Sequence, residues 1–173
     1  VSGTATNITA EQITKLENCD DYNDINFIPL ETADILDGVD SDIVDRIVTN
    51  LKSGVTVAVH TSHLIANFDG FSDDSFNAEL TKDKLASMIT DYLAELTQKV
   101  LAQINVILIT LGGETSYKCC KAINTNELRL MDEVAPAISL CLDENGRWIV
   151  TKSGNLGNTR TLIEILDYFK HHE

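Results

Sequence analysis

Two segments of the sequence share one form, in which an apolar run leads into a glycine turn and then into residues suited to begin a helix. The first reads ILITLGGET over residues 107–115, and the second reads IVTKSGNLGNT over residues 149–159. Glycine lets the backbone approach a ligand closely, and the unpaired N–H groups at a helix start attract anions. Both turns are therefore candidate anion sites, with plain architecture as the alternative at each.

Other catalytic and metal motifs do not fit the sequence. The Lys152 turn is not a P-loop, because that motif places its lysine after the second glycine. No G-x-G-x-x-G follows the first apolar run, and no serine lies in a G-x-S-x-G elbow. His60 and His63 lack an acidic or cysteine partner at ligand spacing, so we expect no zinc site.

The charge balance excludes broad nucleic-acid binding. Asp and Glu number 27 against 13 Lys and Arg, giving a net charge of −14, whereas a nucleic-acid surface is basic. The acidic residues between positions 20 and 45 lack EF-hand spacing and are expected on solvated loops and helix faces. An anion must therefore be bound locally, by backbone N–H groups and one or two cations.

The remaining composition is that of one soluble domain. The apolar run over residues 100–109 is about half the length of a membrane span, and no signal peptide is recognised, so we expect a cytoplasmic protein without a membrane partner. With no C-x-x-C motif, we expect the cysteines to be free buried thiols. Because Val1 is not Met and residues 1–3 resemble a strand end, we expect the chain to come from a longer polypeptide.

Hydrophobic periodicity predicts alternating strands and helices. Helices are expected over residues 9–18, from Asp40 or Ser41 to Gly54, and over 81–103, 114–123 and 161–169. Thr9 is the candidate N-cap of the first helix, and Gln12 completes its capping box. Strands are expected at residues 25–30, 55–60, 106–110, 128–134, 138–142 and 148–151, with a polar loop over 67–77. The pattern favours an α/β fold, a three-layer domain with a largely parallel sheet flanked by helices and a strand-rich annex near 126–151.

Four segments resemble, in the same order, motifs of the C-terminal domain of the four-carbon acid sugar kinase family. GTATNITAEQI (3–13) resembles G-S-C-S-x-x-T-x-x-Q-I, and TLGGETS (110–116) resembles T-G-G-[ED]-T-A. Residues 127–138 resemble E-L-x-G-E-V-x-P-G-x-P, and TKSGNLG (151–157) resembles T-K-S-G-G-F-G. The set spans nearly the whole chain; its departures are Ala5, Ala137, Ile138, Asn155 and Leu156.

The resemblance implies an ATP-dependent kinase that phosphorylates a hydroxyl of threonate, erythronate or an oxo-tetronate. Residues 1–173 would be its nucleotide-binding domain, using ATP and Mg²⁺. A separate N-terminal domain, absent here, would bind the acid sugar and carry the catalytic base, so the isolated chain is expected to be inactive. The alternative is a non-catalytic regulatory or interaction domain that keeps the fold. The sequence leaves open which acid sugar is used and whether the protein is a homodimer.

The resemblance also implies a set of nucleotide-binding residues. One side of the nucleotide would be lined by Gly112, Gly113, Glu114 and Thr115. Phosphates would be cradled by Ser153, Gly154 and Gly157, with Lys152 as the nearby cation and with hydroxyls from Thr4 and Thr6. The alternatives are that Glu114 only favours its helix start, that Lys152 is a solvated strand end, and that Thr9 is a cap.

Overall fold

The computed structural model describes residues 1–3, 6–66 and 81–171 of the chain. The helices are α1 (Asn7–Glu17), α2 (Thr32–Asp37), α3 (Ser41–Lys52), α4 (Ser62–Ala66), α5 (Lys82–Leu101), α6 (Gly113–Ala122) and α7 (Thr161–Lys170), with a short 3₁₀ helix at Asp20–Tyr22. The strands are β1 (Asn26–Pro29), β2 (Val57–His60), β3 (Leu108–Leu111), β4 (Leu128–Ala135), β5 (Ile138–Asp143) and β6 (Trp148–Lys152).

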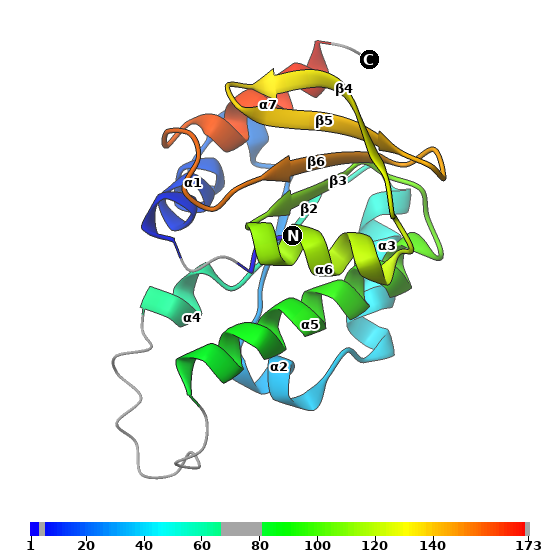
Figure 1. The fold of residues 1–173 in the computed structure, drawn as a ribbon. Helices are drawn as coiled ribbons and strands as arrows, with labels where there is room; N and C mark the ends of the chain where they lie inside the picture. Colours follow the sequence, from blue (N-terminus) through cyan, green and yellow to red (C-terminus); the bar gives the residue numbers. More distant parts are fainter. Residues whose placement is uncertain (4–5, 67–80, 172–173) are drawn as a thin grey trace.

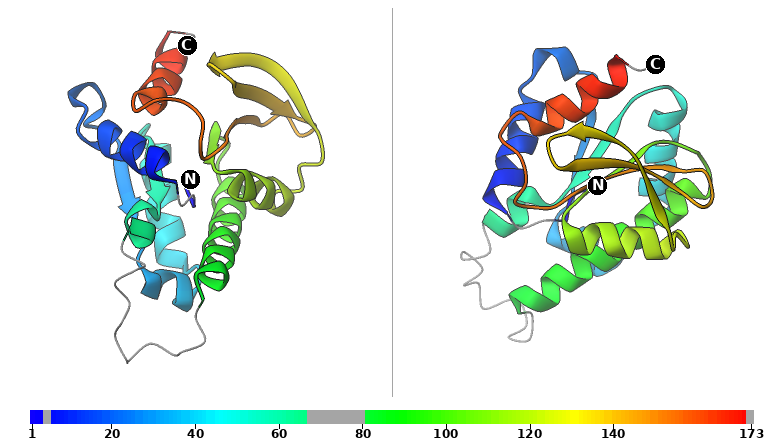
Figure 2. Two further views of the ribbon diagram at one scale, coloured as in Figure 1. Left: turned by 60° about the vertical axis from the view of Figure 1, so that its left-hand side comes forward. Right: turned by 45° about the horizontal axis from the view of Figure 1, so that its top comes forward.

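The strands form a parallel half and an antiparallel half. β1 pairs with β2 and β3 pairs with β6, both in parallel. Ser2 forms parallel bridges to both His60 and Leu111, so the start of the chain lies between β2 and β3, as Figure 2 shows in its left panel. β4, β5 and β6 are antiparallel neighbours, which confirms the strand-rich annex.

Helices cover both faces of the sheet, so the domain has three layers (Figure 1). On one face, α1 and α7 share a core with residues such as Leu111 and Val150. On the other face, α3 and α5 pack on β1 and β2 through residues such as Ile47, Leu93 and Val59. The predicted three-layer α/β fold is confirmed.

The predicted helix cap was correct for α3 and wrong for α1. Asp40 is the N-cap of α3 as expected, with its carboxylate accepting from the Ile43 N–H at 2.8 Å. Thr9 is not the cap of α1, because that helix begins at Asn7 with Thr6 as its N-cap. Gln12 therefore forms no capping box. The sequence patterns also missed the short helices α2 and α4, and the predicted polar loop over 67–77 lies outside the described residues.

The described part of the chain contains no helix long and apolar enough to cross a membrane. All four cysteines are free, as expected, although only Cys119 and Cys141 are fully buried.

Candidate functional site

The two glycine turns lie next to each other at one edge of the sheet. Leu111 and Lys152 are register partners at the carboxyl ends of the parallel strands β3 and β6. The first turn bonds directly to the second strand, since the Gly112 N–H donates to the Lys152 carbonyl at 2.8 Å. Two segments that are 40 residues apart in sequence are thus brought together where α/β sheets bind ligands.

The first turn leads straight into α6. Gly112, its N-cap, has a φ of 109°, a conformation that favours glycine. The Gly112 carbonyl accepts from both the N–H and the hydroxyl of Ser116, each at 2.8 Å. The N–H groups of Gly113, Glu114 and Thr115 belong to the first turn of α6, where helical N–H groups lack helical partners. This turn therefore offers backbone donors together with the positive end of a helix dipole.

A hollow of about 420 Å³ opens in front of this turn. Its floor includes Gly3, Gly112, Gly113 and Thr115, and its far side is formed by α5. A Cβ built on Gly113 would meet nothing within 4 Å, so the space beside this residue is open. A Cβ on Gly3, in contrast, would lie 2.9 Å from both Leu93 Cδ1 and Thr115 Oγ1. Gly3 is thus a glycine because the chain start packs tightly beside Thr115.

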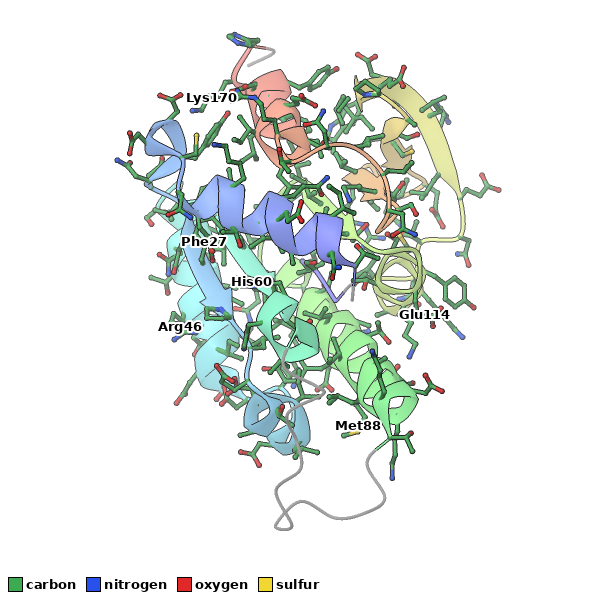
Figure 3. The ribbon with its side chains drawn as sticks, turned by 90° about the vertical axis from the view of Figure 1, so that its left-hand side faces the viewer. Phe27, Arg46, His60, Met88, Glu114 and Lys170 are labelled. Carbon is green, nitrogen blue, oxygen red and sulfur yellow. The ribbon has the colours of Figure 1, made fainter. Side chains whose placement is uncertain are left out.

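The hollow carries charges of both signs. Lys118 lines it and bonds to Asp91 Oδ1 at 2.7 Å and to Ser87 Oγ at 3.2 Å. Glu114 also lines it, 3.9 Å from the Lys118 ammonium, and its side chain lies at the outer surface of α6 (Figure 3). Asp83 is a further carboxylate on the lining. Within the described residues, no group of three or more acidic, histidine or cysteine side chains could hold a metal ion.

The second turn is fastened to α1. The Gly154 carbonyl accepts from the hydroxyls of Thr6 at 2.6 Å and Thr9 at 2.8 Å. The Gln12 amide donates to the carbonyls of Leu156 at 3.1 Å and Asn158 at 2.8 Å. We call these contacts of Thr6, Thr9 and Gln12 the α1 clasp. It fixes the path of the second turn through its carbonyl groups.

Gly157 is fixed by two separate constraints. Its φ is 84°, and a Cβ at this position would overlap the side chain of Thr161. The Thr161 hydroxyl accepts from the Asn158 N–H at 2.9 Å, which connects the end of the turn to α7.

Lys152 is a buried lysine. Its side chain is only 1% exposed, so the interpretation as a solvated strand end is wrong. Its ammonium donates to Thr9 Oγ1 at 3.1 Å and to the Ser153 carbonyl at 3.0 Å. Burial lowers the pKa of Lys152 to about 8. Thr9 of the α1 clasp therefore also accepts a hydrogen bond from Lys152, the one cation of the second turn.

The structure places most of the predicted site residues along one edge. The residues at this edge are Thr6, Gly112, Gly113, Glu114, Thr115, Lys152, Ser153, Gly154 and Gly157. Thr4 lies outside the described residues. The residues that sequence reasoning missed are Gly3, Ser87, Thr90 and Lys118, which line the first turn's hollow. Lys118 could have been found from its i, i+4 spacing to Glu114, but the α5 residues are brought in only by tertiary packing.

The sequence matches a protein-family model described as a nucleotide-binding C-terminal domain over residues 1–162. No curated protein matches it.

The fold is similar to solved structures of much longer chains. A Haemophilus influenzae protein assigned to the family model DUF1537 matches with a TM-score of 0.75 and 19% identity, over 98% of this chain and 39% of that one. A DUF1537 domain of unknown function from Bordetella bronchiseptica, a domain-swapped dimer with bound citrate, matches with a TM-score of 0.66 and 16% identity, over 98% and 40%. The chain thus spans about two fifths of the length of these proteins.

Proposed function

Because the chain belongs to the family of nucleotide-binding C-terminal domains, we propose that it binds ATP with its phosphates against the two glycine turns. The observation that carries this proposal is the open space at Gly113, in front of the first N–H groups of α6. A phosphate placed there gains hydrogen bonds from backbone donors and a favourable helix dipole.

The proposed roles of the two turns differ. Gly113 and Thr115 receive phosphate oxygens through their N–H groups, whereas Gly112 shapes the turn, since its own N–H donates to the Lys152 carbonyl. Lys118 is the cation on the lining of the hollow. Ser153, Gly154 and Gly157 form the neighbouring turn, which is held by the α1 clasp and would contact further phosphate oxygens, with hydroxyls from Thr4 and Thr6. Lys152 keeps this turn in place through its bonds to Thr9 and Ser153.

Mg²⁺ fits this site as a partner of the nucleotide. The hollow presents the carboxylates of Asp83 and Glu114, which are oxygen ligands of the kind that Mg²⁺ accepts. The described residues contain no complete metal site, so the ion would be held mainly by phosphate oxygens. It would neutralise charge between these carboxylates and the phosphates, which a chain of net charge −14 particularly requires.

We further propose that the nucleotide serves a kinase acting on a four-carbon acid sugar. The support is the ordered resemblance of four motifs and the match to much longer chains. Phosphoryl transfer depends mainly on positioning and on charge stabilisation, and the two turns could supply both for the nucleotide. The acid sugar and the catalytic base would lie on a further domain, so residues 1–173 alone are expected to transfer no phosphate to threonate or erythronate.

Calorimetric titration tests nucleotide binding most simply. We expect Mg-ADP to bind the wild-type chain more tightly than adenosine does, because only ADP presents phosphates to α6. Gly113→Val should weaken Mg-ADP binding at least tenfold, since its side chain would occupy the open space beside the turn. Folding should be preserved, because the added Cβ meets no atom within 4 Å.

Ser41→Val provides the matched control, because Ser41 is the exposed first residue of another helix, α3. It should leave Mg-ADP affinity unchanged. Equal affinity of Mg-ADP for wild type and for folded Gly113→Val would contradict the proposed phosphate position.

A further inference from the structure

An apolar slot separates β2 from β3 at the end of the strands opposite to the glycine turns. It has a volume of about 400 Å³. On one face of the sheet it is lined by Ile47, Leu51 and Val100 from α3 and α5, and on the other by Leu166 and Phe169 from α7. The slot thus reaches both faces of the sheet, as a missing strand would.

Residues 1–3 already occupy one end of this gap as an extended segment. The Ser2 N–H donates to the Val59 carbonyl at 2.9 Å, and the Thr61 N–H donates to the Ser2 carbonyl at 3.2 Å. On the β3 side, the Leu111 N–H donates to the Val1 carbonyl at 3.0 Å, and the Val1 amine donates to the Ile109 carbonyl at 2.7 Å. This segment therefore bonds as a parallel strand to both neighbours.

The same ladder can be continued into the slot. In a parallel pair, alternate residues turn their backbone groups to the same side. β1 bonds to Thr56 and His60, so Val57 and Val59 face away from β1. β6 bonds to Gly112, so Ile107 and Ile109 face away from β6 by the same alternation. Repeating the pattern seen at Val1 and Ser2 directs the Val59 and Ile109 N–H groups into the slot.

The register specifies what the slot can hold. Ser2 is opposite His60, and β2 begins at Val57, so two residues before Val1 would complete the ladder. The nearer of the two would lie between Ala58 and Ile109, facing α7. The farther one would lie between Val57 and Leu108, facing α3 and α5. Because both sides are lined by apolar side chains, both residues should be apolar.

We propose that the slot binds an apolar β-strand parallel to β2 and β3 and continuous with Val1, supplied by polypeptide upstream of that residue. The mode is strand addition inside a sheet, in which main-chain hydrogen bonds give affinity and alternate side chains give specificity. The source of the strand rests on the two-domain arrangement proposed above. Occupancy of the slot itself is measured without nucleotide, so the two proposals can fail separately.

The strand would connect the upstream polypeptide to the nucleotide site. Two residues beyond Val1, Gly3 packs beside Thr115 and lines the hollow of the first glycine turn. Fixing the strand fixes Val1 to Gly3, and with them one side of that hollow.

The test adds three residues directly before Val1. One extension, Lys-Val-Ile, places two apolar residues with free N–H groups in the slot. The matched extension, Lys-Gly-Pro, has the same length and charge, but it replaces the two branched side chains by a hydrogen atom and a proline ring and lacks one N–H. Amide hydrogen exchange is followed by NMR in the absence of nucleotide. With Lys-Val-Ile, the Val59 and Ile109 amides should exchange at least tenfold more slowly than with Lys-Gly-Pro, and the thermal midpoint should rise.

A second measurement uses a fluorescent apolar dye, which should bind the open slot and be excluded by Lys-Val-Ile alone. Exchange rates of Val59 and Ile109 that are equal for the two extensions would overturn the proposal, and so would equal dye binding. Slower exchange spread over all strands equally would show general stabilisation and would likewise overturn it.

Discussion

The two glycine turns have similar sequences and opposite environments. The turn at Gly112 opens onto a hollow, and a side chain added at Gly113 would meet no atom within 4 Å. The turn at Gly154 has its carbonyl bonded by two threonine hydroxyls, and a side chain added at Gly157 would overlap Thr161. One turn therefore leaves space and free donors for a ligand, whereas the other uses its backbone to hold the fold.

This difference shows that a strand–glycine–helix pattern predicts where a turn lies in the sheet, but not whether that turn binds a ligand. Glycine serves ligand access at Gly113 but backbone conformation and close packing at Gly157. The α1 clasp holds the residues on either side of Gly157, since Thr6, Thr9 and Gln12 bond to carbonyl groups more than 140 positions away in sequence.

The largest effect is expected from removing the hydroxyls of the clasp. The double substitution Thr6→Val and Thr9→Val keeps the side-chain shapes but leaves the Gly154 carbonyl without these donors and Lys152 without one acceptor. The free energy of unfolding should fall by about 2–4 kcal/mol, because each buried unsatisfied group costs about 1–3 kcal/mol. Urea unfolding measures this change. Thr49→Val, at an exposed position in α3, is the control, and a double variant as stable as this control would contradict the clasp.

The next effect separates close packing from backbone conformation. Gly157→Ala and Gly146→Ala introduce the same methyl group at φ values of 84° and 78°. The first should destabilise the fold more, because its Cβ overlaps Thr161 while that of Gly146 meets nothing within 4 Å. We expect a cost of about 1–3 kcal/mol at either strained position, with the larger value at Gly157. Equal thermal midpoints of the two variants would show that the Thr161 side chain moves aside without a loss of folding stability.

A smaller effect is expected at the cation of the first turn. Lys118→Met should weaken Mg-ADP binding about three- to tenfold and leave adenosine binding unchanged, as one charge–phosphate contact is worth about 1 kcal/mol. Lys15→Met, on the exposed side of α1, should change neither affinity. If Lys15→Met weakens Mg-ADP binding as much as Lys118→Met does, the effect comes from net charge and not from the hollow.

A further effect concerns the titration of Lys152. Burial lowers its folded-state pKa to about 8 from an ordinary value of 10.5. Between these pH values the unfolded chain binds more protons than the folded one, so folding stability rises with pH. The stability of wild type relative to Lys152→Met should therefore increase between pH 8 and pH 10, measured by urea unfolding under reducing conditions. A difference that stays constant or falls over this range would show that Lys152 titrates normally.

The sequence predicted the ends of strands better than the contacts between them. The apolar runs and glycines placed both turns correctly at the carboxyl edge of the sheet, because those signals are local. The assignment of Thr9 as a cap was wrong, since its hydroxyl bonds to Gly154 and Lys152 instead of a nearby N–H. Local patterns could not show the burial of Lys152 or the pairing of Lys118 with Asp91, because both depend on how distant helices pack.

An NMR titration of the ¹⁵N-labelled chain with Mg-ADP tests the division between the two turns most directly. The largest amide shifts should occur at Gly113, Glu114 and Thr115, where the first turn of α6 faces the hollow. Smaller shifts should follow at Ser153 and Gly154, whose turn is held by α1. Largest shifts at the second turn, with Gly113 to Thr115 unmoved, would contradict the account.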